Sequence, residues 1–273
     1  MHQLRQVDVF GSGPLTGNPV AVVHDADDLD DERMQLFAQW TNLSETTFLL
    51  RPTNPGADYR LRIFTPSREL PFAGHPTLGS AHAWLEAGGS PRGDAVVQEC
   101  GAGLVTIARG ERLEFEAPPL LRDGPVDDAD LATITHALGV DRSDIVDARW
   151  IDNGPGWVGV LLGDAHDVLA LRPDLLALAD LDVGVAGPWR DGGSDAQVEV
   201  RAFDRSTEDP VTGSLNASLG QWLAGSVLPE RYVAAQGTAI GRAGRVHVRR
   251  EGTAVWVGGD TRTTVRGEVS LRD

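Results

Sequence analysis

RIFTPSRELPFAG (residues 62–74) returns later in the chain, in altered form, as RAFDRSTEDPVTG (residues 201–213). An ungapped alignment at an offset of 139 residues matches six of the thirteen positions. The matched pairs are Arg62 with Arg201, Phe64 with Phe203, Ser67 with Ser206, Glu69 with Glu208, Pro71 with Pro210, and Gly74 with Gly213. Because the offset is about half of the 273-residue chain, the repeat predicts two copies of one domain rather than a solenoid of short units.

Composition narrows the possible partners. Apolar residues make up 41% of the chain and charged residues 23%, which is typical of a globular core rather than disorder. The formal net charge of −16 argues against nucleic acid and anionic membranes as partners. The N-terminal stretch lacks a signal-peptide pattern, and no run of about 18 apolar residues predicts a membrane span.

The chain has a single cysteine and no lysine, and each fact excludes some classes of chemistry. Cys100 is the sole cysteine, which excludes an intrachain disulfide and a cysteine zinc cluster and favours a cytoplasmic location. The chain has no lysine, which excludes Schiff-base catalysis, lysine-bound pyridoxal phosphate and a P-loop. The histidines show no metal-binding spacing, so we expect neither a metal nor a cofactor.

Hydrophobic periodicity predicts several strands and few helices in each half. Strands are expected at 7–10, 18–23, 45–50, 58–66, 95–100, 103–110 and 112–117, and again at 156–162, 196–203, 245–250, 254–259 and 265–271. Helices are expected at 31–42, 75–89, 131–140, 174–181 and 214–225. Residues 118–130, rich in proline and aspartate, form the best candidate for a linker.

The helices expected directly after the two copies of the repeat are unusually rich in glycine, alanine and serine. A helix with small or apolar residues on nearly all sides is usually surrounded by other structure. The pattern therefore favours a sheet curled around one central helix in each half, with an exposed, poorly formed helix as the alternative.

Each copy of the repeat leads through a glycine into a helix N-terminus, as Gly74-His75 and Gly213-Ser214. Free N–H groups and the helix dipole make such a terminus attract anions. A pseudo-twofold axis would bring both termini to one cleft, where they would bracket a small carboxylate close to His75, Asp209 and Ser214. The alternative is structural, because His75, Asp209 and Ser214 can each cap a helix or form a turn.

Five stretches spread over nearly the whole chain resemble the PhzF-like phenazine-biosynthesis isomerase family. They are TGNPVAVV, SETTFLL, FTPSRELPFAGHPTLGSAHAW, STEDPVTGSLNASLGQWL and AAQGTAIGRAGRVHV. The resemblance implies a diaminopimelate-epimerase-like α+β fold of two pseudo-symmetric domains, each a mostly antiparallel sheet rolled around a central helix. We expect the domains at 1–118 and 119–262, with a C-terminal strand at 263–273 returning to the first.

The resemblance also implies cofactor-free proton transfer on a dihydro-hydroxyanthranilate-like acid. The family's catalytic glutamate falls on Glu45, its histidine on His75 and its aspartate on Asp209. Ser44, Gly74, Gly213 and Ser214 fall at positions that would hold the substrate. A homodimer is expected as in the family. A base that abstracts a proton from carbon works best with a pKa near neutrality, which burial in a closed cleft can provide for a glutamate.

The sequence departs from related patterns at two places. The family's GRPG loop reads GRAG here, with Ala243 in place of proline. Related racemases use paired cysteines, a mechanism that the single Cys100 excludes. Two other functions stay open: a serine hydrolase using Ser214, His75 and Asp209, although no G-x-S-x-G motif supports it, and a non-catalytic small-acid binding protein.

Overall fold

The computed structural model describes residues 1–271, which divide into two compact units. Unit 1 comprises Met1–Glu116 and Gly258–Asp273, and unit 2 comprises Ala117–Val257. The domain limits predicted at 118/119 and 262/263 stay a prediction. No helix within residues 1–271 is long and apolar enough to cross a membrane.

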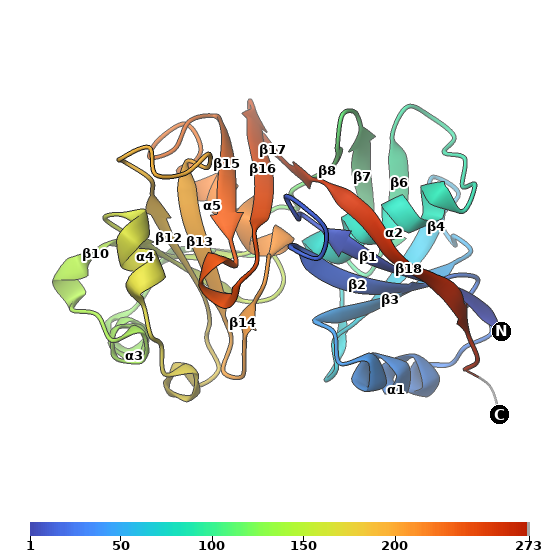
Figure 1. The fold of residues 1–273 in the computed structure, drawn as a ribbon, viewed down its shortest axis with the longest axis horizontal. Coiled ribbons are helices and arrows are strands. Elements are labelled where there is room, and N and C mark those ends of the chain that lie inside the picture. The colour runs from blue at the N-terminus through green and yellow to red at the C-terminus, as the bar shows by residue number, and fades with distance from the viewer. Residues whose placement is uncertain (272–273) are drawn as a thin grey trace. The chain divides into compact units, whose positions relative to one another are not determined.

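Unit 1 is a mixed sheet with two helices among its described residues (Figure 1). Its strands are β1 (His2–Val9), β2 (Asn18–Val23), β3 (Glu45–Leu50), β4 (Tyr59–Phe64), β5 (Glu69–Leu70), β6 (Val96–Cys100), β7 (Gly103–Arg109), β8 (Leu113–Glu116) and β18 (Thr261–Val269), and its helices are α1 (Asp31–Thr41) and α2 (Gly74–Glu86). Hydrogen bonds join them in the order β18-β1-β2-β3-β4-β6-β7-β8, with β5 also paired to β4. The pairs β2–β3 and β4–β6 are parallel and the others antiparallel.

Helix α2 is the centre of unit 1. It packs against β1, β2, β3, β4, β6, β8 and β18, and so contacts strands from one edge of the sheet to the other. Its residues 74–81 and Ala83 are all buried. The small side chains let strands approach closely, since a Cβ on Gly79 would lie 2.4 Å from Val20 Cγ1. The alternative of an exposed helix is therefore wrong.

Unit 2 repeats this plan around α5 (Gly213–Leu223), which packs against β10, β11 and β16 and is buried from residue 213 through 220 (Figure 1). Its strands are β9 (Arg122–Pro125), β10 (Ile145–Asp152), β11 (Trp157–Leu162), β12 (Asp182–Pro188), β13 (Val198–Phe203), β14 (Glu208–Asp209), β15 (Arg231–Gln236), β16 (Gly244–Glu251) and most of β17 (Ala254–Gly259). Its other helices are α3 (Asp128–Leu138) and α4 (Ala165–Ala170), with 3₁₀ turns at Arg142–Asp144, Leu175–Leu178 and Thr238–Ile240.

The two units share one pairing pattern at the predicted offset. The series β1-β2-β3-β4-β6-β7 and the series β10-β11-β12-β13-β15-β16 have the same parallel and antiparallel steps. Phe64 pairs with Glu69 in unit 1, and Phe203 pairs with Glu208 in unit 2. The predicted α+β fold, with a mostly antiparallel sheet around a central helix in each half, is confirmed.

The matched residues of the repeat build the same contact twice. Arg62 donates from Nε and Nη2 to Glu69 at 2.7 and 2.6 Å, and its guanidinium lies 5.0 Å from the Phe64 ring centre. Arg201 donates to Glu208 in the same way at 2.9 and 2.7 Å, with the guanidinium 4.8 Å from the Phe203 ring centre. The repeated letters therefore encode a bidentate ion pair stacked on an aromatic ring.

Several local expectations in the second half are wrong. The stretch 118–130 is not a simple linker, because it contains β9, which pairs with β10, and the first turn of α3. The helix expected at 174–181 is a short 3₁₀ turn at Leu175–Leu178. Strands β10, β12 and β15 and helix α4 lie where no element was expected.

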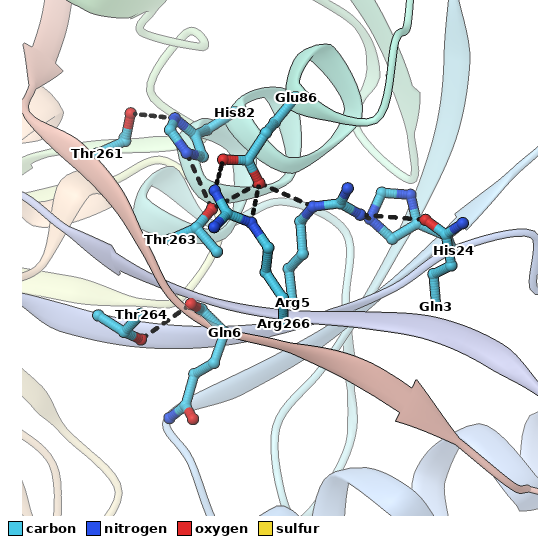
Figure 2. A network of polar contacts seen from close by, with 10 residues as sticks. All are labelled: Gln3, Arg5, Gln6, His24, His82, Glu86, Thr261, Thr263, Thr264 and Arg266. Atoms are coloured by element: carbon cyan, nitrogen blue, oxygen red, sulfur yellow. Dashed lines mark hydrogen bonds and ion pairs between the residues drawn. The ribbon is translucent and has the colours of Figure 1, made fainter.

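The C-terminal strand returns to unit 1 as β18, which pairs antiparallel with β1. The expected strand at 263–273 covers most of β18, and its residues 272–273 lie outside the described residues. Figure 2 shows how side chains hold β18 against α2. Glu86 accepts from Arg5 of β1 and from Arg266 and Thr263 of β18, while His82 lies between Thr261 and Thr263.

Candidate active site

His75 and Glu45 meet in unit 1. His75 lies in the first turn of α2, and Glu45 is the first residue of β3. His75 Nε2 lies 3.3 Å from Glu45 Oε2, with the imidazole 3% exposed and the glutamate side chain 14% exposed. The resemblance placed both residues at the site, and the structure places them in contact.

His75 is neutral in this environment, because burial lowers the pKa of the imidazole to about 3. Nδ2 of Asn18 lies 3.4 Å from Nδ1 of His75. The imidazole also donates a hydrogen bond to the backbone of Pro19, while Nε2 faces Glu45 without forming a hydrogen bond within residues 1–271. The pair is therefore a neutral imidazole beside a carboxyl group rather than an ion pair.

Two other predicted residues flank this pair. Ser44 is half-buried and directly precedes β3, and Gly74 is the buried first residue of α2. Ala73 is the N-cap and makes no side-chain capping bond, so His75 does not cap the helix. The N–H groups of the first turn have no acceptor within the helix, which is the arrangement that favours an anion.

Ser214 occupies the corresponding place in unit 2, in the first turn of α5. Its Oγ accepts a hydrogen bond from Trp157 Nε1 at 3.1 Å, and its carbonyl accepts one from Asn153 Nδ2 at 2.9 Å. The N-cap of α5 is Thr212, without a side-chain capping bond, so the expectation that Ser214 or Asp209 caps this helix is wrong. Because Trp157 donates to the hydroxyl oxygen of Ser214, the hydroxyl proton is left for another acceptor.

Asp209 ends β14, four residues before α5 begins. Its Oδ2 accepts from Thr212 Oγ1 at 2.5 Å, and its carbonyl accepts from Gln236 Nε2 at 3.2 Å. Gln236 is the last residue of β15 and is fully buried. Asp209 is thus fixed by a neighbour on its own loop and by an adjacent strand.

The repeat shows how the two units differ at equivalent positions. At the offset of 139, His75 corresponds to Ser214 and Asn18 to Trp157, and each first-turn residue contacts the side chain that begins the second strand. Glu45 corresponds to Gly184, since Glu45 pairs with Val20 and Gly184 with Gly159.

The other predicted acid, Asp209, lies in unit 2 and has no acidic counterpart in unit 1. Asp209 corresponds to Leu70 at the same offset, so each unit has one carboxylate at a position where the other has none.

Asn18, Trp157, Thr212 and Gln236 contact the predicted residues but were not predicted themselves. Asn18 lies in the quoted TGNP motif, and Trp157 lies at the repeat offset from it, so comparison of the two halves could have found this pair. Gln236 had no such signal, because only the fold brings the end of β15 next to the loop before α5.

A hollow of about 1050 Å³ in unit 1 lies elsewhere. Its lining includes Gly11, His82, Glu86 and Arg112, and none of the predicted site residues. Arg112 is paired with Asp260 and Glu111, and Glu86 with the arginines described above. The hollow therefore has the size of a ligand site but lacks the acid–base pair.

The duplicated fold and the first-turn residues of its two central helices define a class, the enzymes with an epimerase-like fold. A family model described as phenazine biosynthesis-like protein matches residues 7–271. Trans-2,3-dihydro-3-hydroxyanthranilate isomerase of Pseudomonas aeruginosa is 37% identical, over 99% of this chain and 100% of that protein. Antisense-enhancing sequence 1 of Schizosaccharomyces pombe is 36% identical, over 98% of each chain.

Comparison with solved structures also finds proteins of the PhzF family. A phenazine biosynthesis protein of the PhzF family from Enterococcus faecalis superposes with a TM-score of 0.81 at 26% identity, covering 98% of this chain and 99% of that one. The chain belongs to the PhzC-PhzF family of phenazine biosynthesis-like proteins. It is a PhzF-like isomerase.

Proposed function

We propose that the chain is a cofactor-independent isomerase that moves a proton on a small, dihydro-hydroxyanthranilate-like carboxylic acid by general acid–base catalysis. The observation that carries the proposal is the contact between Glu45 and a neutral, buried His75. A carboxylate beside a neutral imidazole can take a proton from carbon and return it elsewhere without a change of net charge at the imidazole.

In this proposal Glu45 is the proton shuttle. The neutral imidazole of His75 lies beside this carboxylate and adjusts its basicity. Charge that develops on the substrate is stabilised by the N–H groups near Gly74 and Gly213, together with the hydroxyls of Ser44 and Ser214. Asp209 assists from unit 2.

We further propose that the chemistry of the reaction is divided between the two copies of the repeat. The support is chemical complementarity between equivalent positions. Unit 1 has the carboxylate Glu45 where unit 2 has Gly184, and unit 2 has the hydroxyl of Ser214 where unit 1 has His75. A proton shuttle from one copy and a hydroxyl in the first turn of the central helix from the other together meet the needs of the reaction, and neither copy has both at these equivalent positions.

The substrate class follows from charge and from the relatives. With a net charge of −16, a bound anion needs a local positive feature, and the two helix N-termini are such features. Relatives at about 35% identity are named trans-2,3-dihydro-3-hydroxyanthranilate isomerase. We propose an acid of that type, namely a small cyclic carboxylic acid that also has hydrogen-bond donors.

The test is a set of small cyclic and amino-substituted acids, including trans-2,3-dihydro-3-hydroxyanthranilate, incubated with the protein in D2O. Mass spectrometry and proton NMR of the recovered acid report deuterium uptake and double-bond position. We expect deuterium at carbon together with an isomerised product. Recovery of every acid unchanged and unlabelled would contradict the proposal and would favour a non-catalytic binding protein.

The serine hydrolase is less well supported by the same geometry. A nucleophilic serine needs a base that accepts its proton, whereas the described partner of the Ser214 hydroxyl, Trp157 Nε1, is a donor. Incubation with a serine-directed phosphonate separates the two functions. Proton transfer predicts no covalent label on Ser214, and stoichiometric labelling would favour hydrolysis.

We also propose that the protein is a cytoplasmic homodimer. The single cysteine, Cys100, motivates the location, and the family resemblance motivates the dimer. Light scattering after size-exclusion chromatography would measure twice the 29.2 kDa chain mass for a dimer, and the mass of one chain would contradict the proposal.

A further inference from the structure

A buried amide network lies behind Asp209 in unit 2. Gln236 and Asn216 are fully buried, and Thr212 is 6% exposed. Gln236 Oε1 accepts from the backbone N–H of Thr212 at 3.0 Å and from Asn216 Nδ2 at 2.9 Å. Gln236 Nε2 donates to the carbonyl of Asp209 and, at 2.9 Å, to Thr212 Oγ1.

Backbone groups fix the direction of every bond in this network. The N–H of Thr212 can only donate, so the side-chain atom of Gln236 that faces it is the oxygen. The carbonyl of Thr212 can only accept, so the atom of Asn216 that lies 2.9 Å from it is the nitrogen. Both amides therefore have a single orientation.

The orientation of Gln236 determines where the Thr212 proton points. Thr212 Oγ1 already accepts from Gln236 Nε2, and it lies 2.5 Å from Asp209 Oδ2. Its own proton is then directed at the Asp209 carboxylate. A hydrogen bond donated to a carboxylate stabilises the ionised form over the carboxylic acid.

We infer that Thr212, oriented by Gln236, is a positioning residue that holds Asp209 ionised, so that Asp209 acts as an acceptor for an N–H or O–H group of the substrate. This inference rests on the proposed function, because it assumes that the reaction is the isomerisation of a small carboxylic acid. It adds a specificity rule, namely that the preferred acid has a hydrogen-bond donor within reach of Asp209. An acid without that donor would lose its hydrogen bond to this carboxylate.

The test compares Thr212→Val and Thr212→Ser. Valine has nearly the same shape without a donor, while serine keeps the hydroxyl. We expect Thr212→Val to move the acid limb of the pH profile of kcat/KM to higher pH by about one unit, because the carboxylate has lost one hydrogen bond. We expect Thr212→Ser to restore the wild-type profile. Thr212→Ala is the second variant if valine prevents folding.

Unit 1 offers a matched control. Thr77 lies in the first turn of α2, and its Oγ1 accepts from the buried amide of Gln98 at 3.0 Å. Thr77→Val removes a comparable buried hydroxyl without removing a donor to Asp209, and we expect no shift of the acid limb. A shift of the same size in Thr77→Val, or no shift in Thr212→Val, would overturn the inference.

A second readout does not depend on activity. The carboxyl carbon of Asp209 is followed by NMR in protein labelled at aspartate, with Asp209→Asn to assign the signal. We expect its titration to move to higher pH in Thr212→Val, and an unchanged titration would overturn the inference. If Asp209→Asn keeps full activity, the proposed role of Asp209 fails, and the NMR titration still decides whether Thr212 holds the carboxylate ionised.

Discussion

Glu45 and Gly184 occupy the same position of a duplicated strand but have diverged completely. At Gly184 the space that a side chain would need is filled, because a Cβ there would lie 2.2 Å from Leu215 Cδ1. Unit 2 therefore cannot hold a carboxylate at this position without repacking α5. The proposed chemistry of this duplicated fold therefore depends on Glu45, a residue that differs between the two copies, rather than on a residue that they share.

Ser214 provides a residue-level test of substrate binding. Ser214→Ala removes a hydroxyl whose proton is available to the acid, because Trp157 already donates to its oxygen. A hydrogen bond to a charged group contributes about 1.5 kcal/mol or more, so we expect KM to rise about tenfold with little change in kcat. Steady-state kinetics measures both constants. A loss confined to kcat would contradict a role in binding.

His24 provides a residue-level test of stability against pH. Burial, together with the Arg5 guanidinium 2.8 Å away, lowers the pKa of His24 to about 4. The folded protein therefore binds fewer protons than the unfolded chain between about pH 6.5 and 4. The contribution of His24 to stability is complete above pH 6.5 and is lost as the pH falls toward 4.

The measurement for His24 is urea unfolding at several pH values, with His24→Gln as the comparison. We expect the free energy of unfolding to fall with decreasing pH less steeply in the variant, by up to about 3 kcal/mol across this window. Identical slopes for the two proteins would contradict the assignment of a neutral, buried His24.

At the scale of elements, the repeated arginine holds a helix to the sheet in each unit. Arg201 donates from Nη1 to the carbonyls of Val168 and Leu171, at the end of α4, while Arg62 donates from Nη1 to Asp31 of α1. The Arg201–Glu208 side chains are 5% and 11% exposed, and those of Arg62–Glu69 are 15% and 42% exposed. The same contact is thus buried in unit 2 and half-open in unit 1.

This difference predicts unequal costs for one substitution. Arg201→Met leaves Glu208 buried without its partner and should destabilise the protein by about 3 kcal/mol or more. Arg62→Met removes a more exposed pair and should cost about 1 kcal/mol or less. Urea unfolding of both variants measures the difference. Equal costs would show that burial does not set the strength of this contact.

Gly79 tests how tightly the sheet surrounds α2. Alanine is the better helix former by about 1 kcal/mol, but its Cβ would lie 2.4 Å from Val20 Cγ1 and 3.1 Å from Val9 Cγ2. We expect Gly79→Ala to lower the free energy of unfolding by about 1–3 kcal/mol through overpacking. A rise in thermal midpoint would contradict close packing of β1 and β2 on this helix.

The sequence predicted the elements that follow strong periodic patterns. Strands β2 and β3 lie at the predicted residues, and α1 differs by one residue at its end. Strands β9 and β12 were missed because Gly and Pro, which weaken a strand pattern, are stabilised there by pairing with distant strands. Helix α4 has six residues, too few for helical periodicity to be visible.

The sequence predicted only part of the candidate site, because some of its contacts join residues that are distant in the chain. Glu45, His75, Asp209 and Ser214 stand in short motifs, so a local reading of the sequence reaches them. Their partners come from elsewhere in the chain: Gln236 lies 27 residues from Asp209, and Trp157 lies 57 residues from Ser214. Such contacts are products of the fold and leave no local pattern.

At the scale of the whole molecule, the chain builds unit 1 from both of its ends. It leaves unit 1 after Glu116 and returns at Gly258, and β18 then completes the sheet beside β1. The Arg266 guanidinium, with Arg5 and Thr263, lowers the pKa of Glu86 to about 2, so the carboxylate at the end of α2 stays charged and holds the strand (Figure 2). The unit that contains the proposed proton shuttle is therefore complete only when the C-terminal strand is in place.

The most direct test of proton transfer by Glu45 is the rate of deuterium exchange into trans-2,3-dihydro-3-hydroxyanthranilate in D2O. It is compared between the wild type, Glu45→Gln in unit 1 and Asp209→Asn in unit 2, with circular dichroism to verify folding. General acid–base catalysis predicts a loss of at least about 100-fold in Glu45→Gln, and the proposed assisting role of Asp209 predicts a marked loss in Asp209→Asn as well. Exchange at the wild-type rate in folded Glu45→Gln would contradict the proposed mechanism.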